Sequence, residues 1–211
     1  MKDFQLKLYV ITNPQLSRGR SHQEVVSRAL EGGARTVQLR DKELSARELL
    51  EEGREILNLT RQNKATLIVN DRVDVALALE AEGVHLGEED LPLPLARKIA
   101  GPRLIIGATV RTPEKALWAQ KKGADYLGAG AIFPSSTKDS APLIGIETLR
   151  EIVKAVSIPV VAIGGISLSN LSQVMEAGVK GVAVISSVIG ARDITGEAEK
   201  FSRVIDEYLR K

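Results

Sequence analysis

Eight short apolar runs recur along this chain, and seven of them lead into a stretch with helical periodicity. In those stretches apolar residues recur at spacings of three and four, as in residues 73–81 and 146–156. A strand followed by a helix, repeated eight times, is typical of a closed (β/α)8 barrel. The sequence therefore predicts an α/β fold, a single TIM barrel domain over residues 1–211, with its active site at the C-terminal ends of the strands. The runs cover residues 7–13, 36–41, 66–71, 83–87, 104–110, 126–132, 159–165 and 181–187.

The length of the chain restricts how these units can be connected. Its 211 residues lie near the short limit for an eight-unit barrel, which typically has about 250. An open, doubly wound sheet is the alternative fold. Eight runs in so few residues, most of them ending in polar side chains, favour closure.

Composition excludes several classes of function. The formal net charge is only +2, which predicts neither a nucleic acid nor a membrane surface as partner. The chain has no cysteine, which excludes a disulfide, a thiolate nucleophile and a zinc site with thiolate ligands. No apolar run approaches the ~18 residues that span a membrane, and the first twenty residues lack a signal-peptide core. A cytoplasmic enzyme is the expectation, and its oligomeric state stays open.

Polar side chains gather where the second and third predicted strands end. Gln38, Arg40 and Lys42 lie at or just beyond the end of the second, and Asn70 and Asp71 lie at the end of the third. Arginine offers a planar fork for phosphate oxygens, and lysine offers a mobile positive charge. The alternatives are a solvated turn at residues 38–42 and a helix N-cap at residues 70–72.

A second acidic cluster follows the fourth strand and includes Asp90. The carboxylates of Asp71 and Asp90 should meet at neighbouring strand ends, where they repel each other. A hard cation relieves this repulsion, and Mg²⁺ prefers one or two carboxylates together with water and phosphate oxygens. The sequence thus predicts one Mg²⁺ ion per subunit. The alternative is a solvated acidic loop.

A second anion site is indicated at the ends of strands six to eight. A hydroxyl-rich loop at 135–138, the Gly164–Gly165 pair and residues 185–187 together match the phosphate site of many barrels. There, backbone N–H groups and a helix N-terminus receive the phosphate. Taken alone, the loop at 135–138 could also be merely polar. His85 lies inside a strand and is interpreted as a packed or barrel-lining residue.

Two anion sites, one of them assisted by a metal, predict two phosphorylated small-molecule substrates, one of them a diphosphate. The chain offers no cysteine and no serine–histidine pair as nucleophile. Bond making should then rely on electrostatic help to a good leaving group.

An ordered set of motifs spans nearly the whole chain and resembles the thiamine-phosphate synthase family. The resemblance implies that a hydroxymethylpyrimidine diphosphate and a thiazole phosphate, or its carboxylated form, join to give thiamine phosphate and pyrophosphate. The substitution would be dissociative and would pass through a carbocation-like state. The motifs are YVIT (9–12), QLRDK (38–42), VNDR (69–72), GVHLGEEDLP (83–92), IIGATV (105–110), GADYLGAG (123–130), FPSSTK (133–138), VVAIGGI (160–166) and GVAVIS (181–186).

The resemblance also implies roles for individual residues. Arg40, Lys42 and Lys138 would neutralise the departing pyrophosphate, and Asp71 and Asp90 would hold Mg²⁺. The pyrimidine diphosphate would be bound by Gln38, Leu39, Arg40, Asp41, Lys42, Asn70, Thr109 and Lys138. The thiazole phosphate would be bound by Ser135, Ser136, Thr137, Gly165, Ile185 and Ser186.

Two positions depart from the family pattern, and both keep a hydroxyl group. Thr109 stands where serine is common, and Ser135 stands where threonine is usual. A related thiazole tautomerase branch uses a histidine where this chain has Arg111, which disfavours that alternative. A non-catalytic phosphate-binding barrel should have lost Asp71, Asp90 or Lys138, and a metal-free isomerase would leave both aspartates unexplained.

Overall fold

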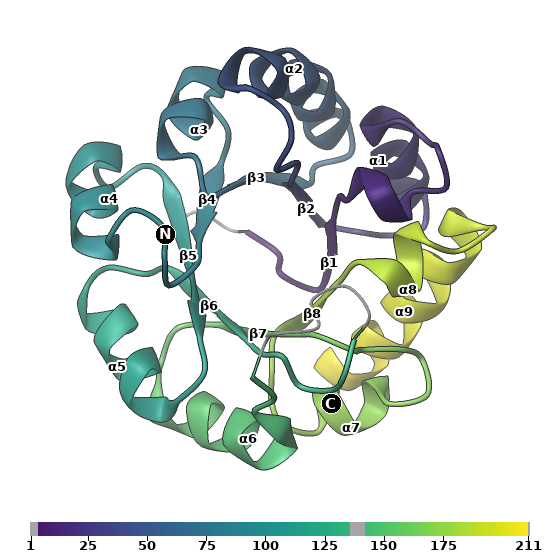
Figure 1. Ribbon diagram of the computed structural model, residues 1–211. Helices are drawn as coiled ribbons and strands as arrows, with labels where there is room; N and C mark the ends of the chain where they lie inside the picture. Colours follow the sequence, from purple (N-terminus) through teal and green to yellow (C-terminus); the bar gives the residue numbers. More distant parts are fainter. Residues whose placement is uncertain (1–3, 136–141, 211) are drawn as a thin grey trace.

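Eight parallel strands close into a barrel in the computed structural model, which describes residues 4–135 and 142–210. The ring is seen end-on in Figure 1, with the helices outside it. The predicted (β/α)8 barrel is confirmed, and the open-sheet alternative is wrong. The extent of one domain over all 211 residues stays a prediction. The strands are β1 Leu8–Ile11, β2 Thr36–Leu39, β3 Thr66–Asn70, β4 Gly83–Leu86, β5 Ile105–Val110, β6 Tyr126–Ala129, β7 Val160–Ile163 and β8 Gly181–Val184.

Closure depends on the first and last strands, which pair in parallel with Leu8 opposite Val182 and Val10 opposite Val184. Every other pairing joins strands that are consecutive in sequence. All strands therefore point the same way, and their C-terminal ends lie at one rim.

The helices follow the strands in alternation, and β8 is followed by two. They are α1 His22–Glu31, α2 Ala46–Gln62, α3 Val73–Leu79, α4 Leu93–Ala100, α5 Pro113–Lys121, α6 Gly145–Ala155, α7 Leu171–Met175, α8 Ser186–Ile189 and α9 Ile194–Leu209. A short 3₁₀ helix, Pro14–Leu16, precedes α1.

Local sequence signals fix where several helices begin. Ser45 and Glu48 form a reciprocal capping box at the start of α2, which satisfies two otherwise unpaired backbone N–H groups. Thr112 caps α5 and is followed by proline at the first helical position, as the sequence predicts. These caps set the point at which the loop after each strand turns back along the barrel.

A continuous apolar layer lies between the strands and the helices. It includes fully buried side chains such as Leu67 and Leu127 from the strands and Ile56, Leu149 and Phe201 from the helices. Burying a side chain of this size contributes about 1.5–3 kcal/mol. This layer fixes the outward-facing strand residues and leaves the alternate residues to fill the interior.

The barrel interior is a second, smaller apolar cluster. Tyr9, Ile68, Ile105, Tyr126 and Val161 meet there, together with Leu6 and Ala183. Phe4, which precedes β1, packs against this cluster, with its ring centroid 6.0 Å from that of Tyr126. The N-terminal segment thus fills the end of the barrel where the strands begin, and only the opposite rim is left for a site.

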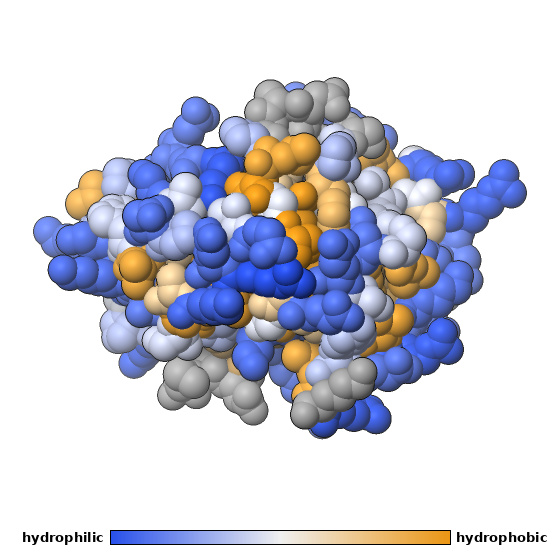
Figure 2. Space-filling model, turned by 90° about the horizontal axis from the view of Figure 1, so that it is seen from below, coloured by the Kyte–Doolittle hydropathy of each residue, from blue (hydrophilic) through white to orange (hydrophobic). Residues whose placement is uncertain are grey.

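The outer surface is mainly polar. The side of the molecule shown in Figure 2 is largely hydrophilic, with apolar residues gathered near its middle. Within residues 4–135 and 142–210, no helix has the length and apolar character needed to cross a bilayer.

Candidate active site

Two adjoining cavities at the rim formed by the C-terminal strand ends contain most of the predicted site residues. The larger, about 540 Å³, is lined mainly by residues that end β2 to β5 or follow them. The smaller, about 160 Å³, is lined by residues at or beyond the ends of β5 to β8. Thr109, Arg111, Ile163 and Ile185 line both cavities. Two ligands held in them would therefore meet at a common junction.

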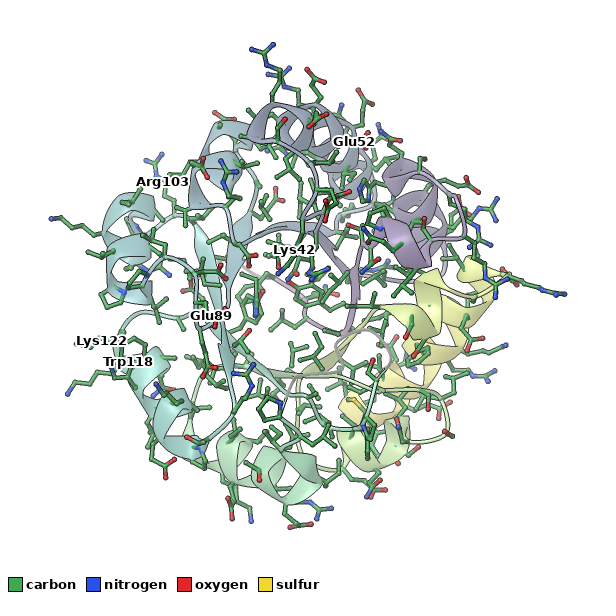
Figure 3. All side chains as sticks on the ribbon, in the orientation of Figure 1. Lys42, Glu52, Glu89, Arg103, Trp118 and Lys122 are labelled. Atoms are coloured by element: carbon green, nitrogen blue, oxygen red, sulfur yellow. The ribbon has the colours of Figure 1, made fainter. Side chains whose placement is uncertain are left out.

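The end of β2 supplies the cations and one amide of the larger cavity. Gln38, Arg40 and Lys42 all line it, and Figure 3 shows Lys42 inside the ring of helices. The backbone of Arg40 is held by Thr12, whose Oγ1 accepts from Arg40 N at 2.9 Å and donates to Arg40 O at 3.2 Å. This two-way contact with the end of β1 fixes the turn from which the Arg40 side chain extends.

Leu39 and Asp41 alternate with these residues and have other contacts. Leu39 is buried in the apolar layer under the helices. The Asp41 Oδ2 atom lies 3.1 Å from His22 Nε2, and its Oδ1 accepts from Glu43 N at 2.9 Å. If these two residues contact a diphosphate, as predicted, they would therefore do so through backbone groups, because their side chains are engaged elsewhere.

Asp71 follows β3 in a backbone conformation that is uncommon for residues other than glycine. Its φ is +62°, and its N–H donates to His85 O at 2.8 Å. The N-cap of α3 is Arg72, without a side-chain capping bond, so Asp71 does not cap that helix. The capping alternative is wrong for Asp71, and the strained conformation marks it as a functional candidate.

Asp71 and Asp90 form the carboxylate pair that the sequence predicts. Both line the larger cavity, and Asp90 is anchored by Gly87 N, which donates to its Oδ2 at 2.6 Å. Burial raises the pKa of Asp71 to about 6, and the adjacent Asp90 carboxylate adds to this rise. Lys42 and Asn70 act in the opposite direction but more weakly. At neutral pH the Asp71 carboxylate is therefore mostly ionised and is repelled by the adjacent Asp90 carboxylate.

The two carboxylates fit a hard cation whose remaining ligands come from water and from a bound phosphate group. Across residues 4–135 and 142–210, no group of three or more acidic, histidine or cysteine side chains is arranged to hold a metal ion. Two carboxylates leave coordination positions for water and phosphate oxygens, which is how Mg²⁺ is commonly held. The residues fit a metal that binds together with a phosphorylated ligand.

The smaller cavity contains the predicted phosphate-binding residues that the structure describes. Ser135, Gly165, Ile185 and Ser186 line it. Gly165 has a φ of +64°, and a Cβ there would lie 2.5 Å from Pro134 O, so the neighbouring loop itself demands glycine. Ser186 opens α8, a single turn of four residues. Ser136, Thr137 and Lys138 lie outside the described residues.

Thr109 and His85 connect the cavities to the barrel interior. Thr109 Oγ1 lies 3.0 Å from His85 Nε2, and the imidazole faces inward, in agreement with its interpretation as a barrel-lining residue. Burial lowers the pKa of His85 to about 4, against an opposing effect from Asp90. His85 is therefore neutral at physiological pH.

Arg111 is a candidate site residue that sequence reasoning missed. It lines both cavities and pairs with Glu88 through Nη1. Its buried Nε has no hydrogen-bond acceptor within the described part of the chain. Strand alternation is the signal that could have found it, since Arg111 follows Thr109 by two positions and shares its face.

Comparisons with known proteins agree on one family. A family model described as thiamine monophosphate synthase matches residues 8–188. Thiamine-phosphate synthase of Pyrococcus abyssi (strain GE5 / Orsay) is 54% identical over 204 residues, 97% of each chain. The Moorella thermoacetica protein of the same name is 52% identical over 202 residues, covering 95% of this chain and 96% of that one. A solved structure of thiamine phosphate pyrophosphorylase from Pyrococcus furiosus superposes with a TM-score of 0.91 at 50% identity, covering 97% of both chains.

The carboxylate pair should lower the stability of the metal-free protein at neutral pH. The folded-state pKa of Asp71 lies above the ordinary value of 3.8. Between about pH 4 and 6 the folded state then keeps a proton that the unfolded state releases, so stability falls as pH rises. Asp71→Asn should raise the unfolding free energy at pH 7.5 by roughly 1–2 kcal/mol, after allowance for partial exposure, and change little at pH 4. Urea unfolding in chelator measures both values.

Asp74→Asn is the matched control, because Arg72 lowers the pKa of the Asp74 carboxyl and the pair is exposed. It should be neutral or slightly destabilising at pH 7.5. A less stable Asp71→Asn protein at that pH would contradict the description of the pair as mutually repelling.

Proposed function

The chain belongs to the thiamine monophosphate synthase family, and we propose that it joins a pyrimidine methyl diphosphate to a thiazole phosphate at the described rim. Family membership makes it a transferase of thiamine biosynthesis that forms thiamine phosphate. What we propose beyond this is which cavity binds each substrate, which residues hold the metal ion and how the bond forms. The thiazole partner is either the simple phosphate or its carboxylated form.

The observation that carries this proposal is the junction between two anion-binding cavities. The larger cavity contains Arg40, Lys42 and the carboxylate pair, and the smaller contains the loop ends near Gly165 and Ser186. A reaction that joins two phosphorylated molecules needs their reacting atoms together and their phosphates apart. The shared wall between the cavities meets that requirement.

The larger cavity is proposed to bind the diphosphate. The Arg40 guanidinium and the Lys42 ammonium would pair with its oxygens, while Gln38, Asn70 and Thr109 would contact the pyrimidine end. Lys138 is assigned to the same diphosphate from the sequence, and Leu39 and Asp41 would take part through their backbones.

Asp71 and Asp90 are proposed to hold one Mg²⁺ ion in each subunit. When bound, this ion would neutralise negative charge on the diphosphate. The support is the carboxylate pair itself, because burial and the adjacent Asp90 carboxylate together raise the pKa of Asp71.

The smaller cavity is proposed to bind the thiazole phosphate. Gly165, Ile185, Ser186 and Ser135 line it, and the first three would contact the phosphate through backbone groups. Ser136 and Thr137 are assigned to the same phosphate from the sequence alone. The two consecutive left-handed residues Gly164 and Gly165 turn the chain sharply at this point.

The proposed reaction is a substitution at the methylene carbon of the pyrimidine. The carbon–oxygen bond breaks, its electron pair leaves with pyrophosphate, and the thiazole nitrogen forms the new bond to that carbon. Arg40 and Lys42 would stabilise the negative charge that grows on the leaving group. Ile163 and Ile185 line both cavities beside Thr109 and Arg111, so the junction has an apolar side, which would disfavour attack by water on the cationic carbon.

Product formation tests the proposed function directly. The purified protein, both substrates and Mg²⁺ should yield thiamine phosphate and pyrophosphate in equal amounts, measured by chromatography and a pyrophosphate assay. The carboxylated thiazole phosphate is assayed in parallel. Absence of thiamine phosphate with both thiazole forms would overturn the proposal.

Turnover should require a divalent cation. Excess chelator should reduce product formation to background, and added Mg²⁺ should restore it. Asp71→Asn should lose turnover by about 10²–10³-fold while keeping wild-type circular dichroism, since it removes one of the two carboxylates proposed to hold the ion that neutralises the leaving group. Undiminished turnover in chelator would show that the carboxylate pair serves another purpose.

Substitutions in the two cavities should affect different substrates. Arg40→Gln should reduce turnover by about 10²–10³-fold and leave the KM for thiazole phosphate near the wild-type value. Gly165→Ala should instead raise that KM while the KM for the diphosphate stays unchanged, because a Cβ at Gly165 would lie 2.5 Å from Pro134 O and displace the backbone groups proposed to face the phosphate. The loss of about one hydrogen bond to a charged group corresponds to an increase of about 10–100-fold. Circular dichroism and thermal melting check that both variants fold. The reverse pattern would mean that the cavities are assigned to the wrong substrates.

A further inference from the structure

A hydrogen-bond network crosses the barrel interior and joins two residues that line the larger cavity. Gln38 Nε2 donates to Tyr9 Oη at 2.7 Å, and Tyr9 Oη lies 2.9 Å from Tyr126 Oη. Tyr126 Oη lies 3.0 Å from His85 Nδ1, and His85 Nε2 lies 3.0 Å from Thr109 Oγ1. These five side chains, here called the interior network, come from five different strands, β2, β1, β6, β4 and β5.

The middle of the interior network lies beneath the cavity. Gln38 and Thr109 line the cavity, whereas Tyr9 and Tyr126 are 2% and 0% exposed and belong to the interior cluster. Glycines make room for the rings. A Cβ at Gly107 would lie 2.1 Å from Tyr126 Cζ and 2.5 Å from His85 Nδ1, and one at Gly128 would lie 2.9 Å from His85 Cε1. Two strand positions therefore need glycine, because any side chain there would clash with these rings.

The hydrogen bonds of the interior network can be followed in one direction. The Gln38 amide nitrogen can only donate, so Tyr9 Oη accepts from it and gives its own proton to Tyr126. Burial raises the pKa of both phenols, so each keeps its single proton. Tyr126 then donates to His85 Nδ1, which leaves the imidazole proton on Nε2, directed at Thr109.

This direction fixes the polarity of both ends. Thr109 Oγ1 accepts from His85, so its own hydroxyl proton is free to point into the cavity. At the other end, one N–H of Gln38 Nε2 is engaged with Tyr9, which orients the amide and leaves its Oε1 atom as an acceptor. The cavity is thus offered an acceptor on one side and a donor on the other.

We infer that Tyr9, Tyr126 and His85 are positioning residues that hold Gln38 as an acceptor and Thr109 as a donor toward the heterocycle of the diphosphate substrate. The inference rests on the proposed function for its ligand. The complementary ligand is a ring with an exocyclic amine to donate and a ring nitrogen to accept, as in an aminopyrimidine.

The tautomer of His85 reports the direction of the interior network without any substrate. With ¹⁵N-labelled histidine, NMR should show the proton of the His85 ring on Nε2; the spectrum of His22→Gln assigns the signals. Tyr126→Phe removes the donor to Nδ1 and frees Thr109 to donate to Nε2, so a form protonated on Nδ1 should appear. Tyr208→Phe is the matched control, because Tyr208 lies on the α9 surface and donates to Glu176.

Two NMR results would overturn the inference: a wild-type His85 protonated on Nδ1, or a tautomer in Tyr126→Phe that is the same as in the wild type. The spectrum of Tyr208→Phe should match the wild type. Because no substrate is needed, this measurement stands even if the proposed function fails in the product assay.

Kinetics separate positioning from mere folding. Tyr126→Phe should raise the KM for the pyrimidine diphosphate by about 5–10-fold, the effect of roughly one misdirected hydrogen bond, and leave the KM for the thiazole phosphate unchanged. Tyr208→Phe should keep wild-type values for both. Equal increases for both substrates, or no increase for either, would show that the interior network does not direct Gln38 and Thr109.

Discussion

Pairing of β1 with β8 is the constraint on which the rest of this structure depends. It brings Leu8 beside Val182, across most of the chain, and closes the sheet so that eight C-terminal strand ends share one rim. Residues as distant in sequence as Gln38 and Ile185 thereby line one cavity. Because Phe4 and the interior cluster fill the opposite end, chemistry is confined to this rim.

The rim combines charges that are unfavourable to the empty protein. Asp71 takes a left-handed conformation beside Asp90, and burial with this neighbour raises the pKa of its carboxyl. Arg111 has a buried Nε without an acceptor in the described chain. Each of these features costs free energy. A cation would relieve the carboxylate repulsion, and phosphate oxygens would supply an acceptor for Arg111. The apolar layer outside the strands offsets that cost.

Much of the fold follows from periodicity, because buried parallel strands and amphipathic helices leave distinct patterns. The eight apolar runs contain all eight strands, although the observed strands are shorter, as with Leu8–Ile11 inside 7–13. The positions of Arg40, Asp71 and Asp90 at the rim follow from the same rule. Periodicity cannot tell which inward side chains touch, so it finds neither the bonds between Tyr9, Tyr126 and His85 nor the role of Gly107. The pairing of Asp41 with His22 was hidden for the same reason.

The central claim is that the Asp71–Asp90 pair is completed by a divalent ion bound together with a diphosphate. Crystals grown with Mn²⁺ and inorganic pyrophosphate test it most directly, because anomalous scattering locates the metal without ambiguity. We expect one anomalous peak per subunit, within coordination distance of both carboxylates and of pyrophosphate oxygens, with Arg40 and Lys42 contacting the same anion. Pyrophosphate bound in the larger cavity with no metal between Asp71 and Asp90 would contradict it.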